Sequence, residues 1–171
     1  MSEALQALYE GNEEKARRLL PPDGELSVFE AAAFGRLERL RELLDENASV
    51  ATAYSADGFT ALHLAIFGGQ EEAVRLLLER GADPNALSTG EVARVPPLGT
   101  AAFVRSVPLA RLLLDSGADV DGRGEGGFTA LHTARQNGDD ALAALLLQRG
   151  ADASLATDDG RSPDDLAADR N

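Results

Sequence analysis

A recurring segment constrains the fold of this chain more than any other feature. The sequence Thr-Ala-Leu-His begins at Thr60 and again at Thr129, and in both copies three consecutive leucines and then Gly-Ala-Asp follow at the same distances. A third copy between them has the leucines and Gly-Ala-Asp, with Pro96 in place of the threonine. From 60 to 96 and from 96 to 129 the spacing is 36 and 33 residues. This period predicts an array of helical repeats, each a helix pair plus a turn.

Apolar residues within each copy follow the spacing of an amphipathic helix. In the copy that begins at Thr60, the two apolar stripes are Leu62, Ala65 and Ile66, and then Val74, Leu77, Leu78 and Gly81. Thr60 is a candidate N-cap, and Gly81 stands where the second helix needs a left-handed exit. One helix pair cannot bury both stripes, so the copies are expected to stack on one another. The sequence therefore predicts an all-α protein.

These residues resemble the ankyrin repeat, whose Thr-Pro-Leu-His opening, leucine-rich second helix and Gly-Ala-Asp exit are matched with alanine in place of proline. Weaker copies lie around Gly35, in residues 2–20 around Gly11, and from Gly160 onward. The resemblance implies an all-α solenoid of stacked antiparallel helix pairs with projecting hairpin-like fingers, about five and a half repeats long. The expected single domain divides into units at approximately 1–24, 25–57, 58–93, 94–126, 127–159 and a partial 160–171.

Composition narrows the possible functions. The chain has 171 residues, of which 44% are hydrophobic, no cysteine and a formal net charge of −13. Its acidity disfavours sequence-independent binding to nucleic acid, and indicates either solubility or attraction to a basic partner. No apolar stretch reaches the roughly 20 residues of a membrane span, and no export signal follows Met1. We therefore expect a cytoplasmic monomer, and Lys15, the one lysine among 16 basic residues, suggests a GC-rich bacterial genome.

The histidines and paired aspartates are the candidates for chemistry. His63 and His132 occupy the fourth position of the threonine motif, where the resemblance implies a structural histidine that bonds the threonine and a neighbouring repeat. Two stacking steps separate them by roughly 20 Å, too far to share a metal ion. The aspartate pairs at 139–140, 158–159 and 164–165 suit helix starts and turns. We expect no catalytic residue, metal ligand or cofactor. An aspartate-dependent hydrolase or divalent-metal-binding protein remains the alternative, as does a scaffold without a native partner.

Phenylalanines mark the candidate binding surface. Phe59 and Phe128 directly precede the motif threonines, Phe67 and Phe103 end first helices, and Phe34 lies one position further along. The resemblance implies that such positions line the concave face where protein partners dock, and aromatic residues are favoured interface anchors. The alternative is that the rings pack between fingers and cover the core. The predicted protein-binding residues are Phe34, Asp57, Phe59, Phe67, Val95, Phe103, Val104, Phe128, Gln136 and Asn137.

The middle copy departs from the pattern. It has Pro96 for threonine, Gly99 for histidine, Arg105 for the second turn glycine, and three additional residues within 86–95. A helical glycine costs about 0.5–1 kcal/mol relative to alanine. Several departures from the motif in one copy indicate either a functional or strained site. The alternative is an insertion that the loop tolerates. We expect residues 86–100 to exchange amide hydrogens faster than the other copies.

Overall fold

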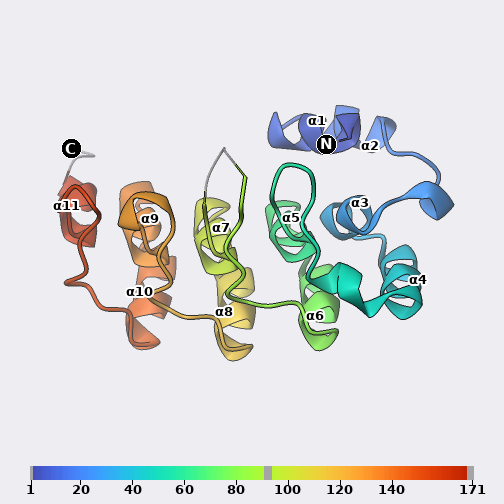
Figure 1. The fold of residues 1–171 in the computed structure, drawn as a ribbon. Helices are drawn as coiled ribbons and strands as arrows, with labels where there is room; N and C mark the ends of the chain where they lie inside the picture. Colours follow the sequence, from blue (N-terminus) through green and yellow to red (C-terminus); the bar gives the residue numbers. More distant parts are fainter. Residues whose placement is uncertain (1, 91–93, 169–171) are drawn as a thin grey trace. The chain divides into compact units, whose positions relative to one another are not determined.

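A computed structural model of the chain describes residues 2–90 and 94–168. It separates into unit 1, residues 1–83 with 89–91, and unit 2, residues 84–88 with 92–171. The described residues form eleven α-helices, with short 3-10 turns and no strand, which confirms the all-α prediction (Figure 1). The three additional residues expected in 86–95, the boundary at 93 and the end at 171 involve positions outside the described residues. The division into six repeat units stays a prediction.

Unit 1 contains three helix pairs. Their bounds are α1 (Glu3–Tyr9), α2 (Glu13–Arg18), α3 (Val28–Ala33), α4 (Leu37–Glu46), α5 (Ala61–Phe67) and α6 (Glu71–Glu79). Ser27 is the N-cap residue of α3, and its side chain forms a capping box with that of Glu30. Helix α3 packs along α5, and α4 packs along α6 (Figure 1). The apolar stripes of two consecutive pairs are buried in this way, as the repeat pattern predicts.

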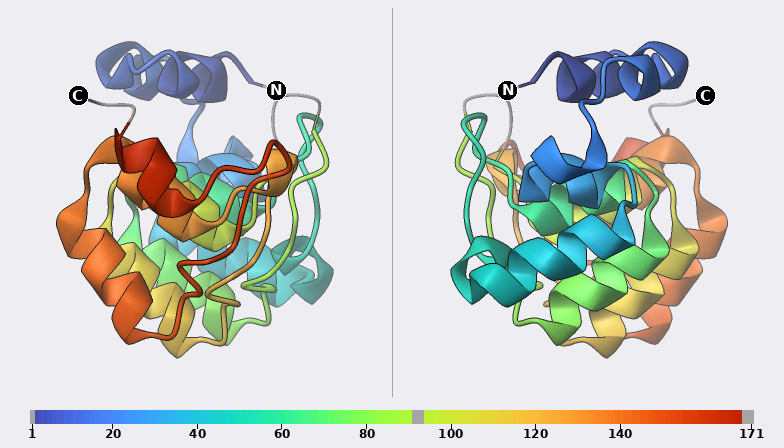
Figure 2. Two further views of the ribbon diagram at one scale, coloured as in Figure 1. Left: turned by 90° about the vertical axis from the view of Figure 1, so that its left-hand side faces the viewer. Right: turned by 90° about the vertical axis from the view of Figure 1, so that its right-hand side faces the viewer.

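The first helix pair of unit 1 does not continue this stack. We expected residues 2–20 to form the terminal repeat, and they do form a helix pair. However, α1 contacts α3 far less than α3 contacts α5. Both views of Figure 2 show the α1–α2 pair lying across the ends of α3 and α5 and not in line with the α3–α4 pair. We call α1 and α2 together the N-terminal hairpin.

Unit 2 repeats the two-layer arrangement. Its helices are α7 (Pro97–Phe103), α8 (Val107–Asp115), α9 (Ala130–Asn137), α10 (Asp140–Gln148) and α11 (Pro163–Ala168). Helix α9 packs between α7 and α11, and α8 packs along α10. Pro96 is the N-cap residue of α7, with an extended backbone and no side-chain cap bond. Pro97 follows at the first helical position, where a missing N–H is tolerated.

The predicted fingers are present as short hairpins before the first helices. Backbone N–H groups donate to carbonyl oxygens across each finger: Ser55 to Phe59 at 2.8 Å, Gly124 to Phe128 at 2.7 Å and Thr157 to Arg161 at 2.9 Å. The finger that precedes α7 is closed by Ser88 N–H and Val95 C=O at 3.1 Å. Each finger therefore holds the residue just before a first helix in a fixed extended conformation.

The turns between paired helices need a left-handed residue. Gly35, Gly69 and Gly138 adopt φ angles of 64°, 68° and 68° at this turn. In the middle copy Arg105 takes the same conformation, with φ 57°. Among the described residues, Arg105 is the one residue other than glycine that has a positive φ angle. A side chain in this region is strained, and such strain is concentrated at functional sites.

Gly99 has a packing role that the sequence did not reveal. A Cβ atom placed on Gly99 would lie 2.7 Å from Cγ2 of Val95, closer than carbon atoms approach without displacement. Gly99 is buried within α7. Its missing side chain therefore makes room for Val95, which offsets part of the helix-propensity cost of glycine.

Candidate protein-binding surfaces

The predicted binding residues of unit 1 lie against the N-terminal hairpin. We call Phe34, Asp57, Phe59 and Phe67 the unit 1 surface. Phe34 is buried, with 7% of its surface exposed, and belongs to one apolar cluster with residues of α1 and α2. Phe59 and Phe67 are partly buried at the edge of the same cluster. The unit 1 surface is thus brought together, and it is covered by a segment of the same chain.

Tyr9 makes the most specific contacts with the unit 1 surface. Its hydroxyl donates a hydrogen bond to Oδ2 of Asp57 at 2.9 Å. Its ring meets the edge of Phe67 with a centroid distance of 5.2 Å, and lies 6.1 Å from the ring of Phe59. Burial raises the pKa of Tyr9, and the hydrogen bond to Asp57 and the charge of that carboxylate raise it further. Tyr9 therefore remains a neutral hydrogen-bond donor.

Sequence reasoning overlooked Tyr9, although a signal was present. Tyr9, Phe67 and Phe103 each stand two residues before the left-handed residue of an interhelical turn: Gly11, Gly69 and Arg105 respectively. The same register places Gln136 before Gly138 in the last complete copy. Aligning the copies on the turn residue would have identified Tyr9 as a member of the aromatic set.

The predicted residues of unit 2 lie on the fingers and first helices of that unit. We call Val95, Phe103, Val104, Phe128, Gln136 and Asn137 the unit 2 surface. Phe103 is 65% exposed at the end of α7. Gln136 is exposed near the end of α9, and Val95, Val104, Phe128 and Asn137 are partly exposed. The ring of Phe128 packs on His132, with centroids 5.7 Å apart.

Asn137 and Arg105 join the ends of α7 and α9. The Asn137 amide donates to the Ala102 carbonyl oxygen at 3.4 Å, and the Arg105 guanidinium donates to the Asn137 carbonyl oxygen. A cation at this carbonyl is favourable because the last carbonyl groups of α9 carry partial negative charge. Asn137 therefore helps to fix the spacing of the two helices beneath Phe103. Arg105, which was not in the predicted set, stands exposed beside it.

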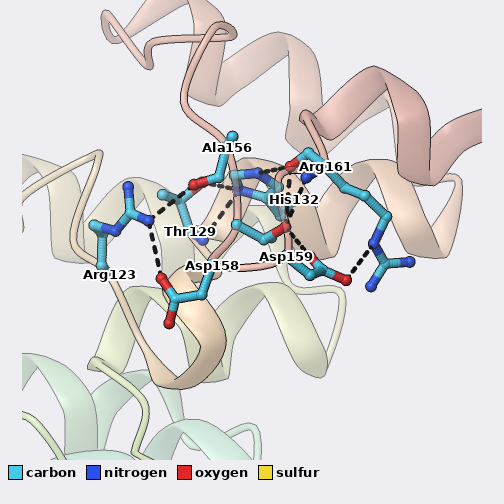
Figure 3. A network of polar contacts seen from close by, with 8 residues as sticks. Arg123, Thr129, His132, Ala156, Asp158, Asp159 and Arg161 are labelled. Carbon is cyan, nitrogen blue, oxygen red and sulfur yellow. Dashed lines mark hydrogen bonds and ion pairs between the residues drawn. The ribbon is translucent and has the colours of Figure 1, made fainter.

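The two histidines make the contacts expected of structural residues. Nδ1 of His63 lies 2.8 Å from the Thr60 hydroxyl, and Nδ1 of His132 lies 2.9 Å from the Thr129 hydroxyl. Nε2 of His132 lies 3.2 Å from the carbonyl oxygen of Arg161 in the next finger (Figure 3). Because Nδ1 accepts from the Thr129 N–H at 3.2 Å, the proton is assigned to Nε2, which donates to Arg161. Burial lowers the pKa of His132, so the ring is held neutral.

The paired aspartates serve turns, caps and ion pairs. Asp158 faces Arg123 at 3.5 Å, and Asp159 accepts from Arg161 at 2.8 Å (Figure 3). Asp139 caps α10. Hydrogen bonds from Ser162 lower the pKa of Asp165, and a hydrogen bond from Thr157 together with the Arg161 charge lowers that of Asp159. A general acid needs the opposite shift. In the described ranges, no group of three or more His, Cys, Asp or Glu side chains is placed to hold a metal ion.

Comparison with known proteins identifies the family. The family model "Ankyrin repeats (3 copies)" matches residues 1–88, and the model "Ankyrin repeat" matches residues 126–159. The first match alone covers more than half of the 171 residues, and the chain therefore belongs to the ankyrin repeat family. Residues 89–125, which include the irregular middle copy, lie between the two matches. The described part of the chain has no helix long and apolar enough to cross a membrane.

Three relatives illustrate the range of proteins that share these repeats. The chain is 34% identical to ankyrin repeat and SOCS box protein 3 of Bos taurus over 95% of this chain and 33% of that protein. It is 42% identical to the B-cell lymphoma 3 protein homolog of Mus musculus over 58% of this chain and 22% of the relative. The chain is 36% identical to an ankyrin repeat-containing protein of Treponema pallidum over 71% of this chain and 40% of that protein. The chain thus spans less than half the length of these relatives.

Proposed function

We propose that this chain is a non-catalytic protein-binding module and that its partner contacts the unit 2 surface. Ankyrin repeats generally mediate protein–protein interaction, which supports the class of function. The observation that carries the proposal is the 65% exposure of Phe103. Full burial of such a side chain by a partner would contribute about 1.5–3 kcal/mol.

The neighbours of Phe103 suit an interface. Arg105 is exposed two residues away and is held by the end of α9. Aromatic residues and arginine are enriched among the residues that dominate binding energies. The strained backbone of Arg105 is maintained although glycine occupies this turn in the other copies. We infer that Phe103 and Arg105 form the centre of the interface, with Gln136 and Phe128 at its margin.

Capture of a partner by matched variants tests this function. The immobilised chain is compared with Phe103→Ser and with Leu147→Ser, because Leu147 is also an exposed large apolar residue of unit 2, 39% exposed on α10. We expect a protein from a lysate of the source organism to be retained by the unaltered chain and by Leu147→Ser, and lost with Phe103→Ser. Equal retention by all three would refute the role of Phe103, and retention by none would refute the binding function.

The proposal includes a bacterial, cytoplasmic setting and a monomeric state. The preference for arginine over lysine supports a bacterial origin. The net charge of −13 supports a monomer, because like charges on two copies repel each other. Light scattering during size-exclusion chromatography should give the monomer mass of 18.0 kDa. Cell fractionation of the source organism tests the location.

A further inference from the structure

The N-terminal hairpin has the character of a bound ligand. The apolar stripe of α1 consists of Ala4, Leu5 and Leu8, which are 1%, 3% and 9% exposed. These residues join Ala33, Phe34 and Leu64 in one cluster, with Phe59 and Phe67 at its edge. An amphipathic helix thus lies on finger and first-helix positions of unit 1, including Phe67, which is equivalent to the 65% exposed Phe103 of unit 2.

The contact includes polar recognition as well as apolar packing. Ala4, Leu5, Leu8 and Tyr9 recur at i, i+1, i+4 and i+5, the spacing of one helix face. The Tyr9 hydroxyl reaches Asp57, in the finger that precedes α5, at 2.9 Å, and its ring packs on Phe67. The unit 1 surface therefore fits a helix with a small and apolar stripe that ends in an aromatic hydroxyl.

The hairpin is only loosely integrated with the repeats. Within α2, Ala16 is the buried residue, and the rest of that helix is exposed. The connection to α3, residues 19–27, is partly or fully exposed except at Leu26, which is 1% exposed. Its backbone bonds are local, from Glu25 to Pro22 and from Leu26 to Asp23, and its side-chain contacts with the repeats include the Asp23–Arg36 ion pair and the bond from Arg39 to the Leu26 carbonyl oxygen. The α3–α5 and α4–α6 contacts are made between these helices themselves, without the hairpin.

The edge of the contact between hairpin and repeats is open to solvent. A crevice of about 40 Å³ lies there, lined by apolar and polar side chains that include Leu8, the exposed Arg17, Phe34 and Gln70. A space of this size and polarity admits water, whereas a folded core is close-packed. The contact is therefore dry at Ala4 and Leu5 and accessible to water at its edge.

We propose that the N-terminal hairpin is a displaceable internal occupant of the unit 1 surface, and that this surface binds an external amphipathic helix of the same chemistry. That helix carries Ala or Leu at i, i+1 and i+4 and a tyrosine at i+5 that bonds Asp57. The tether gives the hairpin an effective concentration in the millimolar range, so an external helix must compete with it. This inference rests on unit 1 alone and is independent of the partner proposed for Phe103.

A trans-binding experiment tests the proposal with the full chain. Leu5→Asp places a charge in the buried stripe and should release the hairpin, while Gln6→Asp adds the same charge on the exposed face of α1. The probe is a fluorescent synthetic peptide of residues 2–20. We expect Leu5→Asp to bind it at least tenfold more tightly than the unaltered chain or Gln6→Asp, and a peptide with phenylalanine for Tyr9 to bind more weakly. Equal binding to all three proteins, or no binding to Leu5→Asp up to about 1 mM, overturns the proposal.

Hydrogen exchange separates a displaceable occupant from a structural cap. In the unaltered chain, amides of α1 and α2 should show protection at least tenfold lower than those of α3 and α5, because the hairpin opens on its own. In Leu5→Asp, α3 to α6 should keep their protection. If α1 exchanges together with α3 and α5, or if Leu5→Asp removes protection from α3 to α6, the hairpin is part of the fold and the proposal fails.

Discussion

Unit 1 and unit 2 carry aromatic residues at equivalent repeat positions, yet the two sets have different environments. Phe67 and Phe103 both stand two residues before a left-handed turn. Phe67 is partly buried against the N-terminal hairpin, whereas Phe103 is 65% exposed. The difference arises from the extra helix that lies on unit 1 and not from the residue type. An aromatic ring at this repeat position is thus partly buried when a helix covers it, as at Phe67, and mostly exposed at Phe103.

The largest expected effect comes from truncating one ring in each unit. Phe34→Ala should lower the free energy of unfolding by about 3 kcal/mol, the cost typical of removing a buried phenylalanine. Phe103→Ala should change it by less than about 0.5 kcal/mol, as for other surface substitutions. Chemical denaturation followed by circular dichroism gives both values. Similar losses for the two variants would show that Phe103 is packed in solution, and the contrast between the units would disappear.

The second prediction concerns the histidine that joins consecutive repeats. His132→Ala removes the bonds to Thr129 and Arg161 and leaves their buried groups unsatisfied, which costs about 1–3 kcal/mol. Thermal unfolding measures the loss. Thr133→Ala, one residue along α9 and partly exposed, is the control and should shift stability much less. If His132→Ala leaves the melting temperature unchanged, His132 does not stabilise the fold and the prediction is wrong.

The same histidine predicts how stability depends on pH. Burial lowers the pKa of His132 in the folded chain below its usual value of about 6.5. Below pH 6.5 the unfolded state therefore binds a proton that the folded state does not bind, so stability is complete above this pH and falls as the pH decreases towards the folded pKa. His132→Gln should flatten this part of the stability profile. A profile that keeps its slope in the variant would assign the dependence to other groups.

A smaller effect is expected for the hydroxyl that joins the hairpin to unit 1. Tyr9→Phe removes the hydrogen bond to Asp57 and should weaken the docked state by about 1 kcal/mol. Exchange of the α1 amides measures this change, and Tyr54→Phe is the control because Tyr54 is 44% exposed. No change in α1 exchange for Tyr9→Phe would mean that apolar packing alone holds the hairpin.

Alkaline titration gives an independent measure of the same bond. The folded pKa of Tyr9 is raised above the usual value near 10. Docking is therefore at full strength below pH 10 and is lost as the pH rises towards the folded pKa. In the Tyr54→Phe variant Tyr9 is the one tyrosine left, so ultraviolet absorbance reports its ionisation directly. Ionisation at the usual pH would show that the ring is solvated.

Much of the fold followed from the sequence because the repeat signals are local. The threonine motifs, leucine triplets and turn glycines each specify a cap, a stripe or a left-handed residue, and stacking follows from exposed stripes. The histidine contacts were implied by the resemblance to the ankyrin repeat, and the structure shows that the bond between Thr60 and His63 is local, within one helical turn. The close contact between Gly99 and the Val95 side chain could not be predicted from the sequence, because it depends on how the finger approaches α7.

The position of the N-terminal hairpin could not be predicted from the sequence pattern. Residues 2–20 have the spacing of a repeat, and a family model that begins at residue 1 includes them. Their position depends on long-range contacts of Tyr9 and Leu8 with Phe67 and Phe34, which no local spacing encodes. The candidate site residues of unit 1 were therefore selected by their equivalence to other copies, while the helix that covers them was assigned to the stack.

The smallest expected effect compares equivalent threonines in the irregular and regular copies of unit 2. Thr100 and Thr133 each follow the motif histidine position, which Gly99 fills in one copy and His132 in the other. The Thr133 hydroxyl donates to the Thr129 carbonyl oxygen at 3.5 Å, whereas the buried Thr100 hydroxyl has no hydrogen-bond partner among the described residues.

Thr100→Val should therefore raise stability by up to about 1 kcal/mol, because valine keeps the β-branched shape and removes an unsatisfied polar atom. For a chain of this size that gain corresponds to an increase of about 2–4 °C in melting temperature. Thr133→Val should leave stability unchanged or lower it slightly, since it exchanges a bonded, partly exposed hydroxyl for a methyl group. If Thr100→Val destabilises the chain more than Thr133→Val does, the Thr100 hydroxyl is hydrogen-bonded in solution, and the irregular copy is better satisfied than its departures from the motif indicate.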